Sequence, residues 1–362
     1  MRIRDIAVLT MLIPVASVWA AEEVHSITPA LAAVCVPVNG PIALDGVLDD
    51  AVWEQAYAFS GFTFSTGSEL TPNATRVAIV RDAEALYLGV TCLEENMAGL
   101  KATETTRDSS VWHDDVIEVF LDTSHDHANY RQFAVNSVPA LFDAKSGTGT
   151  WDGEWEAASA KGDDWWSLEI RIPFATLGSA PQVGDVWGMN VCRERQAGGT
   201  RNELHNWADV QGNFLRPWLF GHLHFAAADF EMTDATAREM FSGIGVPTKV
   251  FLRSGYTLIG RKGVAGSLDY REMLAQRMAG GDDLIKQHAE LAASYRAHED
   301  LAHRDEFEAI DRAFRSLRRD AQGEGALDPV QWSLQMGRLD TLGERMVDLG
   351  WKIKLALLIR GA

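Results

Sequence analysis

Short stretches of alternating apolar and polar residues recur along the first two thirds of the chain, between turns rich in Gly, Pro, Asn and Asp. Alternation places the apolar side chains of a stretch on one face of a sheet, and closely spaced stretches of this kind are typical of antiparallel sandwiches. We therefore predict an all-β, antiparallel sandwich of jelly-roll or immunoglobulin-like type at residues 36–226. Its predicted strands span 76–81, 86–92, 116–122, 132–136, 166–172, 186–192 and 219–225.

After residue 269 the apolar residues recur every three or four positions, which predicts helices. One such stripe runs through 284–317 and predicts a long helix that ends at Gly323 and Gly325. Asp328 and Pro329 supply an N-cap and a first-turn proline for a second helix. We predict an α-helical hairpin at residues 269–362. The apolar stripe of the second helix comprises Leu339, Leu342, Met346, Leu349 and Ile353.

The stripe of the second helix is long for a single short partner. It predicts a homodimer through the C-terminal helices, or docking of these helices onto the sandwich. Residues 227–268, between the two regions, are rich in glycine and hold one strand-like stretch at 248–259. We predict a linker there, with one hairpin as an option.

The first twenty residues have the pattern of a secretory signal peptide. Arg2 and Arg4 precede an apolar run at 6–18, and small residues lie at the −3 and −1 positions of a cleavage site after Ala20. An N-terminal membrane anchor is the alternative, but the run is short for a span of roughly 20 residues and Pro14 interrupts it. We expect export, with a periplasmic or extracellular location.

The charge balance excludes some partners. The chain carries 33 basic and 51 acidic residues, a net charge of −18. A partner held through phosphates would meet repulsion, so nucleic acid and anionic membrane surfaces are disfavoured. The 3 cysteines form no CxxC motif, and a Cys92–Cys192 bridge and two buried thiols remain alternatives.

The segment at 112–122 carries the most informative chemistry. Alternation buries Ile117, Val119 and Leu121 and turns Glu118 to the opposite face; the same pattern in 132–136 turns Gln132 and Asn136 outward. Trp112 and Trp207 lie in polar, loop-like contexts. Indole rings beside acids and amides suit a sugar, which has C–H faces for stacking and a rim of hydroxyl groups for hydrogen bonds.

Together these residues resemble the family 9 carbohydrate-binding modules. The resemblance extends over about residues 36–226, with its elements in the family's order. It rests on IALDGVLDDAVW at 42–53, LYLGV at 86–90, WHDDVIEVFLD at 112–122, QFAVN at 132–136, IPF at 172–174, WGMN at 187–190 and FGHL at 220–223.

The resemblance implies a β-sandwich in which two tryptophans clamp a sugar, at the positions of Trp112 and Trp207. It also implies ligand contacts from Glu118 and Asn136. One departure is Ala134, where the family motif has Arg; Arg193 or Arg195 would have to reach the site in its place, from the segment 192–195. The resemblance further implies structural calcium, for which the oxygen ligands would be Asp45, Asp49, Asp122 and Asp126.

We predict an exported carbohydrate-binding protein that acts in polysaccharide degradation or capture. Two alternatives remain: a secreted glycoside hydrolase or its accessory subunit, and an extracytoplasmic interaction protein that acts through its helical region. A hydrolase needs two carboxyl groups about 5–9.5 Å apart, whereas Asp114 and Glu118 on one strand would lie about 13 Å apart. A zinc site is a weaker option, from His222 and His224 on one strand face and His125-Asp126-His127 in a loop.

Overall fold

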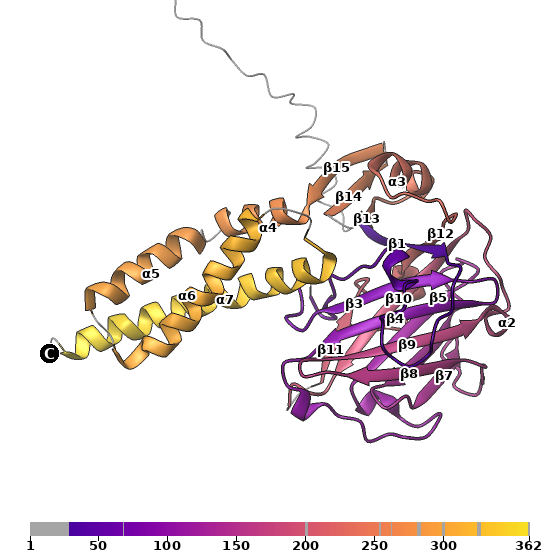
Figure 1. The fold of residues 1–362 in the computed structure, drawn as a ribbon, viewed down its shortest axis with the longest axis horizontal. Coiled ribbons are helices and arrows are strands. Elements are labelled where there is room, and N and C mark those ends of the chain that lie inside the picture. Colours follow the sequence, from indigo (N-terminus) through magenta and orange to yellow (C-terminus); the bar gives the residue numbers. More distant parts are fainter. Residues whose placement is uncertain are drawn as a thin grey trace, which may run out of the picture.

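A computed structural model of the chain shows a β-sandwich from which an elongated helical arm projects (Figure 1). The predicted signal peptide at residues 1–20 lies outside the residues that the structure describes. These are 29–67, 69–199, 202–252, 255–261, 263–280, 284–298, 301–323 and 327–360.

Two sheets form the sandwich. The β5 sheet has the strand order β7-β6-β5-β10-β12-β1, and the β4 sheet has the order β1-β3-β4-β9-β8. The strands are β1 (Ala30–Pro37), β2 (Thr63–Phe64), β3 (Thr75–Arg81), β4 (Ala85–Leu93), β5 (Val116–Asp122), β6 (Arg131–Asn136), β7 (Leu141–Lys145), β8 (Glu156–Lys161), β9 (Trp165–Pro173), β10 (Val186–Arg195), β11 (Glu203–Asn206) and β12 (Gly221–Phe225).

The core fills the space between the two sheets, as the alternating pattern predicts. Ile117 and Val119 of β5 face Leu88 and Val90 of β4 across this space, and all four are fully buried in one apolar cluster. The same cluster continues into the arm. The predicted mostly-β domain followed by helices is confirmed.

The strand β1 departs from the antiparallel prediction. It pairs in parallel with β12 from Ala32 to Cys35 and with β3 at Val36 and Pro37, so it belongs to both sheets. Sequence reasoning missed β1 because its residues do not alternate. Ala33 and Cys35 face the main core while Val34 and Val36 face a second buried cluster, and a strand buried on both faces has a continuous apolar sequence.

Residues 227–268, predicted as a linker, instead extend the β5 sheet. They contain α3 (Asp234–Phe241), β13 (Thr248–Phe251), β14 (Gly255–Gly260) and most of β15 (Gly263–Asp269). β13 pairs in parallel with β1, and β14 and β15 follow as antiparallel neighbours. Phe241, Val250 and Ile259 pack over the second face of β1, which explains why this glycine-rich stretch is ordered against the sandwich.

The described residues of the arm form four α-helices where two are predicted. They are α4 (Tyr270–Ala279), α5 (Leu284–His298), α6 (Arg304–Gln322) and α7 (Pro329–Arg360). The predicted long helix is divided, because α5 ends at His298 and α6 begins at Arg304. The two helices run back along each other, with His288 stacked on Phe314 at 3.9 Å and Tyr295 on Phe307 at 4.1 Å between ring centroids.

The apolar stripe of α7 is buried inside the arm. Leu342, Leu349 and Ile353 belong to the main apolar cluster together with residues of α5 and α6, and α7 contacts both of these helices. The stripe from which the sequence predicts a dimer is therefore used within one chain. No helix in the described part of the chain is both long enough and apolar enough to span a membrane.

The arm joins the sandwich through Trp332, in the first turns of α7. Its buried ring stacks on Tyr270 of α4, with 4.9 Å between centroids. The same ring covers Gly61 in the loop before β2, where a side chain would begin 3.2 Å from the indole and the φ of +86° also favours glycine. One indole therefore contacts both α4 and the sandwich.

We predict that Trp332→Ala destabilises the chain by about 3–5 kcal/mol, because it removes a buried indole and leaves a cavity at this joint. Urea unfolding measures the loss, and limited proteolysis should show faster cleavage between the arm and the sandwich. Trp218→Ala, at an exposed tryptophan of the sandwich, is the matched control. A loss below about 1 kcal/mol in Trp332→Ala, within the range of surface substitutions, would contradict this role.

Candidate functional site

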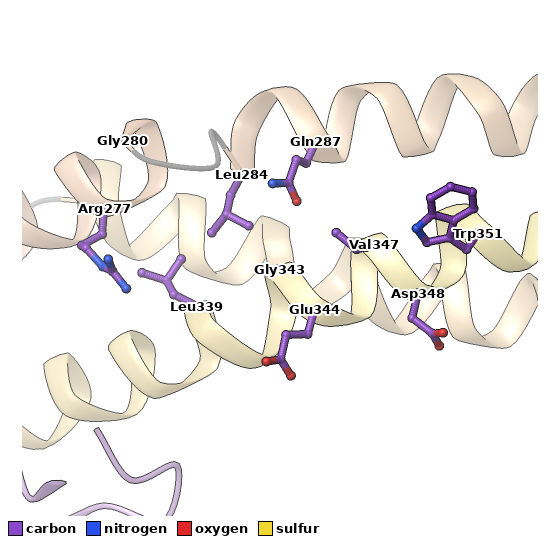
Figure 2. Close-up of a pocket in the computed structure, with 10 residues that line it drawn as sticks. All are labelled: Arg277, Gly280, Leu284, Gln287, Leu339, Gly343, Glu344, Val347, Asp348 and Trp351. Carbon is purple, nitrogen blue, oxygen red and sulfur yellow. The ribbon is translucent and has the colours of Figure 1, made fainter. Parts of the chain in front are cut away.

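A hollow of about 250 Å³ lies on the outer face of the β5 sheet. Trp112, Glu118, Gln132 and Glu194 line it together with a loop at 212–215. It combines an exposed indole with hydrogen-bonding side chains, the chemistry that the sequence predicts for a sugar site. A second hollow, of about 770 Å³, lies between helices of the arm and outside the sandwich (Figure 2).

Strand alternation and register bring the polar residues of this hollow together. Glu118 lies on the central strand β5, opposite Ala134 of β6 and Cys192 of β10. Gln132 and Glu194 are each two residues from these partners, so they are diagonal neighbours on the same face. The Nε2 of Gln132 donates to Oε2 of Glu118 at 2.6 Å.

Glu118 and Glu194 form a carboxyl pair. Burial raises the pKa of Glu118 to about 8, and the charge of Glu194 and a hydrogen bond to it add to the shift. Burial also raises the pKa of Glu194, whose Oε2 accepts from Nδ2 of Asn202 at 2.7 Å. Near neutral pH Glu118 is protonated and donates a hydrogen bond to the carboxylate of Glu194, since two adjacent carboxyl groups do not both ionise readily.

Trp112 lies at the rim of the hollow, in a short 3-10 turn, η3 (Val111–His113), and 38% of it is exposed. Phe142 of β7 packs edge-on against its ring, with 5.3 Å between centroids. Gln196, after β10, donates from Nε2 to the backbone oxygen of Trp112 at 3.2 Å. The ring is thus fixed in place while a large part of it contacts solvent.

The polar residues beside Trp112 hold its turn against the sheet. Asp114 accepts hydrogen bonds from the backbone nitrogens of Thr103 and Glu104 and from Nδ2 of Asn136. Burial alone would raise the pKa of Asp114, but these bonds outweigh burial and hold the pKa below its usual value. Asp115 likewise accepts from the backbone nitrogens on either side of the turn, at Lys101, Gln196 and Ala197.

Asn136, predicted to contact ligand, belongs to this support instead. It is fully buried, its Nδ2 donates to Glu104 and Asp114, and its Oδ1 accepts from the backbone nitrogens of Val138 and Ala140. With its hydrogen bonds satisfied inside the loop, it does not border the hollow. Gln132, on the same strand, is the amide that lines the hollow, where the sequence analysis expected Asn136.

The opposite wall of the hollow is the loop from Gly212 to Leu215. Gln211 and Gly212 adopt positive φ values of +55° and +81°, which turn the chain over the sheet. Phe214 packs on Phe120 of β5 beneath it, and Leu215 remains largely exposed. A flat ligand beside Trp112 would therefore contact an apolar loop, not a second indole.

Trp207, predicted as the second clamp residue, lies in the core. Only 1% of it is exposed, and its ring packs on Phe59 with 4.5 Å between centroids. Its nearest hollow is a separate one, also lined by Trp332 and Phe251 at the base of the arm. Its polar sequence neighbours suggested a loop, but the backbone nitrogen of Trp207 bonds to Val191 of β10 and its ring turns inward.

Arg193 and Arg195 also face inward, since they share strand parity with the core residues Met189 and Val191. Both guanidinium groups bind the buried carboxylate of Glu94, at 3.0 Å from Arg193 and at 2.7 Å from Arg195. Burial would raise the pKa of Glu94, but hydrogen bonds from Arg195 and the charge of Arg193 hold it below its usual value. Neither arginine borders the hollow, whereas Glu194 between them does.

The four aspartates predicted for calcium do not come together. Asp45 and Asp49 belong to a loop on the β4 sheet, where the backbone nitrogens of Asp45 and Gly46 bind Glu169 of β9. Asp122 and Asp126 lie in the β5–β6 turn, where they accept hydrogen bonds from His127 and Asn129. A calcium cage needs six to eight converging oxygens, and these carboxylates are divided between two sheets.

The structure also places the histidines predicted for zinc and the two cysteines of the possible bridge. His125 and His222 share a hydrogen bond of 2.9 Å, and burial lowers the pKa of His222 to about 4. Within the described ranges, no group of three or more His, Cys, Asp or Glu side chains is arranged to hold a metal ion. Cys92 and Cys192 are free thiols, because Cys92 faces the core and Cys192 the outer side of the β5 sheet.

Sequence comparison agrees with this architecture. Residues 44–227, half of the chain, match the model of the carbohydrate family 9 binding domain-like family. The chain belongs to this family. The matched range of the family 9-like domain includes the whole hollow beside Trp112 and ends before the helical arm.

Several solved structures are similar to the family 9-like domain. A family 9 carbohydrate-binding module from Caldicellulosiruptor kristjanssonii, in complex with cellotriose, is 19% identical, covers 55% of this chain and 98% of its own, and has a TM-score of 0.42. The same module in complex with glucose is also 19% identical, covers 55% of this chain and 99% of its own, and has a TM-score of 0.42. A putative carbohydrate-binding protein from Bacteroides uniformis is 14% identical, covers 54% of this chain and 99% of its own, and has a TM-score of 0.45. No curated protein matches the chain.

We predict that Glu94→Gln costs about 3–5 kcal/mol of stability, because it leaves two buried guanidinium groups short of a counter-charge. Urea unfolding at neutral pH measures the loss, with Glu95→Gln, at an exposed neighbour, as the control. Because the folded state lowers the pKa of Glu94, the stabilisation holds above the unfolded value of about 4.3 and is lost as pH falls through the folded pKa. An undiminished stability in Glu94→Gln would remove the structural role given to Arg193 and Arg195.

We predict a second pH dependence, of opposite sign, from Glu118. The folded state keeps its proton up to about pH 8, whereas the unfolded chain releases it near pH 4.3. Stability should therefore fall as pH rises through this window, and Glu118→Gln should remove that part of the slope. Thermal melts across the window, with Glu156→Gln on the β4 sheet as control, measure it. Parallel profiles for wild type and Glu118→Gln would show that the carboxyl pair is not buried as described.

Proposed function

We propose that the protein binds carbohydrate, and that the sugar occupies the hollow on the outer face of the β5 sheet. The supporting observation is that the exposed ring of Trp112 shares one hollow with the hydrogen-bonding trio Glu118, Gln132 and Glu194. The ring offers a stacking surface for the C–H face of a sugar. The trio offers carboxyl and amide oxygens to the hydroxyl groups at its rim.

The charges of the hollow favour a neutral sugar. None of the described residues that line it is Lys or Arg, and Arg193 and Arg195 on β10 are occupied by Glu94. A sugar acid would bring its carboxylate next to Glu118 and Glu194 with no Lys or Arg among the described lining residues to balance it, at a desolvation cost. At position 134, opposite Glu118, the chain has the small Ala134 and no basic side chain.

The carboxyl pair does not support hydrolysis. Retaining and inverting glycosidases hold their two carboxyl groups about 5–9.5 Å apart so that the scissile bond lies between them. Glu118 and Glu194 are in hydrogen-bond contact, which is too close for that arrangement. We propose that the pair binds hydroxyl groups and does not act as acid and nucleophile.

We also propose that the protein is exported and takes part in polysaccharide capture or degradation. The support is the signal-peptide pattern at residues 1–20 together with a binding site built for sugar. Mass determination of the N-terminus of the protein purified from its native host tests export: a mature chain that begins near Ala21 is expected.

We predict that Trp112→Ala weakens sugar binding by about 1–3 kcal/mol, the range found for stacking of flat ligands on aromatic rings, and leaves the melting temperature nearly unchanged. Calorimetric titration with cello-oligosaccharides and other neutral glycans measures it. Trp351→Ala, at an exposed tryptophan of the arm, should bind as wild type does. Equal affinities for Trp112→Ala and wild type would place the sugar elsewhere.

A further inference from the structure

The hollow of about 770 Å³ in the helical arm opens between α4, α5 and α7 (Figure 2). Leu284 and Gln287 reach into it from α5, and Leu339 of α7 forms part of its floor. Gly343 of α7 also lines it, and Leu284 of α5 approaches α7 closely at this glycine. Glu344 and Asp348 lie along its open edge.

An exposed apolar ridge continues from this hollow along the same helix. Val347, Trp351, Leu355 and Leu358 are 51%, 66%, 59% and 72% exposed. Their spacing of four, four and three residues places them on one face of α7. This face is distinct from the buried stripe, and nothing in the described part of the chain covers it. A contiguous apolar surface of this kind marks an interaction site.

The hollow and the ridge are complementary under two-fold symmetry. When two identical helices pack antiparallel about a two-fold axis, the numbers of facing residues have a constant sum. With the axis at Leu349, Val347 faces Trp351 of the second copy. The same register places the exposed Leu355 at the level of Gly343, which lines the hollow.

The charges agree with this register. It places Lys354 opposite Glu344, both of which are exposed. In the single chain Lys354 lies over the ring of its own Trp351, with Nζ 4.9 Å from the centroid, so its ammonium group is already at the ridge. After Asp348, α7 carries lysines and no acid as far as Ile359, whereas Glu344 and Asp348 lie on the other side of the axis.

We propose that the exposed face of α7 binds a second copy of this chain, as an antiparallel pair about a two-fold axis near Leu349. Each copy inserts its ridge into the hollow of the other, and Lys354 and Glu344 pair across both ends. The contact is one helix face wide, which is small compared with the roughly 1,200–2,000 Å² of stable interfaces. The dimer is therefore weak and depends on concentration.

A charge swap in the full chain tests this register. Lys354→Glu places two acids together at both ends of the contact, and Glu344→Lys places two lysines together. Each single variant should weaken dimerisation about tenfold or more in sedimentation equilibrium, and the double variant should regain most of the loss. Arg312→Glu, which reverses an exposed charge on α6, is the matched control and should dimerise as wild type does.

A second pair of variants separates the contact from folding. Leu355→Asp should leave the chain monomeric with an unchanged melting temperature at low concentration, because Leu355 is exposed in the single chain. A wild-type chain that stays monomeric at the highest soluble concentration would overturn the proposal, as would dimers unaffected by Leu355→Asp. Two weakened single variants without recovery in the double variant would overturn the antiparallel register. Binding of the ridge of a monomeric chain to lipid vesicles would replace the second copy with a membrane surface.

Discussion

The double burial of β1 is the constraint on which the rest of the structure depends. One face of this strand completes the core between the two sheets, and the other is covered by α3, β13 and β14. Because β1 pairs with β12 in one sheet and β3 in the other, it fixes how the β5 sheet lies over the β4 sheet. The meander that leads into the arm is also anchored to β1, through β13.

The alternation of residues predicted most of the sandwich because each of those strands has one buried face. It could not predict β1, whose residues are apolar throughout. It did indicate the hairpin at 248–259, which β13 and β14 form, but not that this hairpin pairs with β1 and continues into β15. In the arm, helical periodicity was correct locally. It could not show that the long stripe at 284–317 folds back on itself, since the break at the end of α5 has no strong sequence signal and the pairing of His288 with Phe314 is tertiary.

The candidate site was partly predictable from strand alternation. Glu118 and Trp112 are where alternation and family resemblance place them. Glu194 could have been found by extending the parity of Met189 and Val191 along β10, which turns Arg193 and Arg195 inward and Glu194 outward. The burial of Trp207 could not be predicted, because its sequence neighbours are polar and only the backbone hydrogen bond to β10 turns the ring into the core. Asn136 was mistaken for a ligand-binding group because buried support and ligand contact use the same kind of side chain.

The length of α7 has a consequence for polymer binding. At about 1.5 Å per residue its 32 residues extend for roughly 48 Å, and its first turns are fixed to the sandwich at Trp332. A pair joined near Leu349 would therefore hold two sugar hollows on a rigid spacer. A long glycan that reaches both hollows would be retained far better than a short one, although each hollow binds with the same intrinsic affinity, because the second contact is intramolecular. The length of the arm would then set the spacing between binding sites on a polysaccharide that the dimer can occupy at the same time.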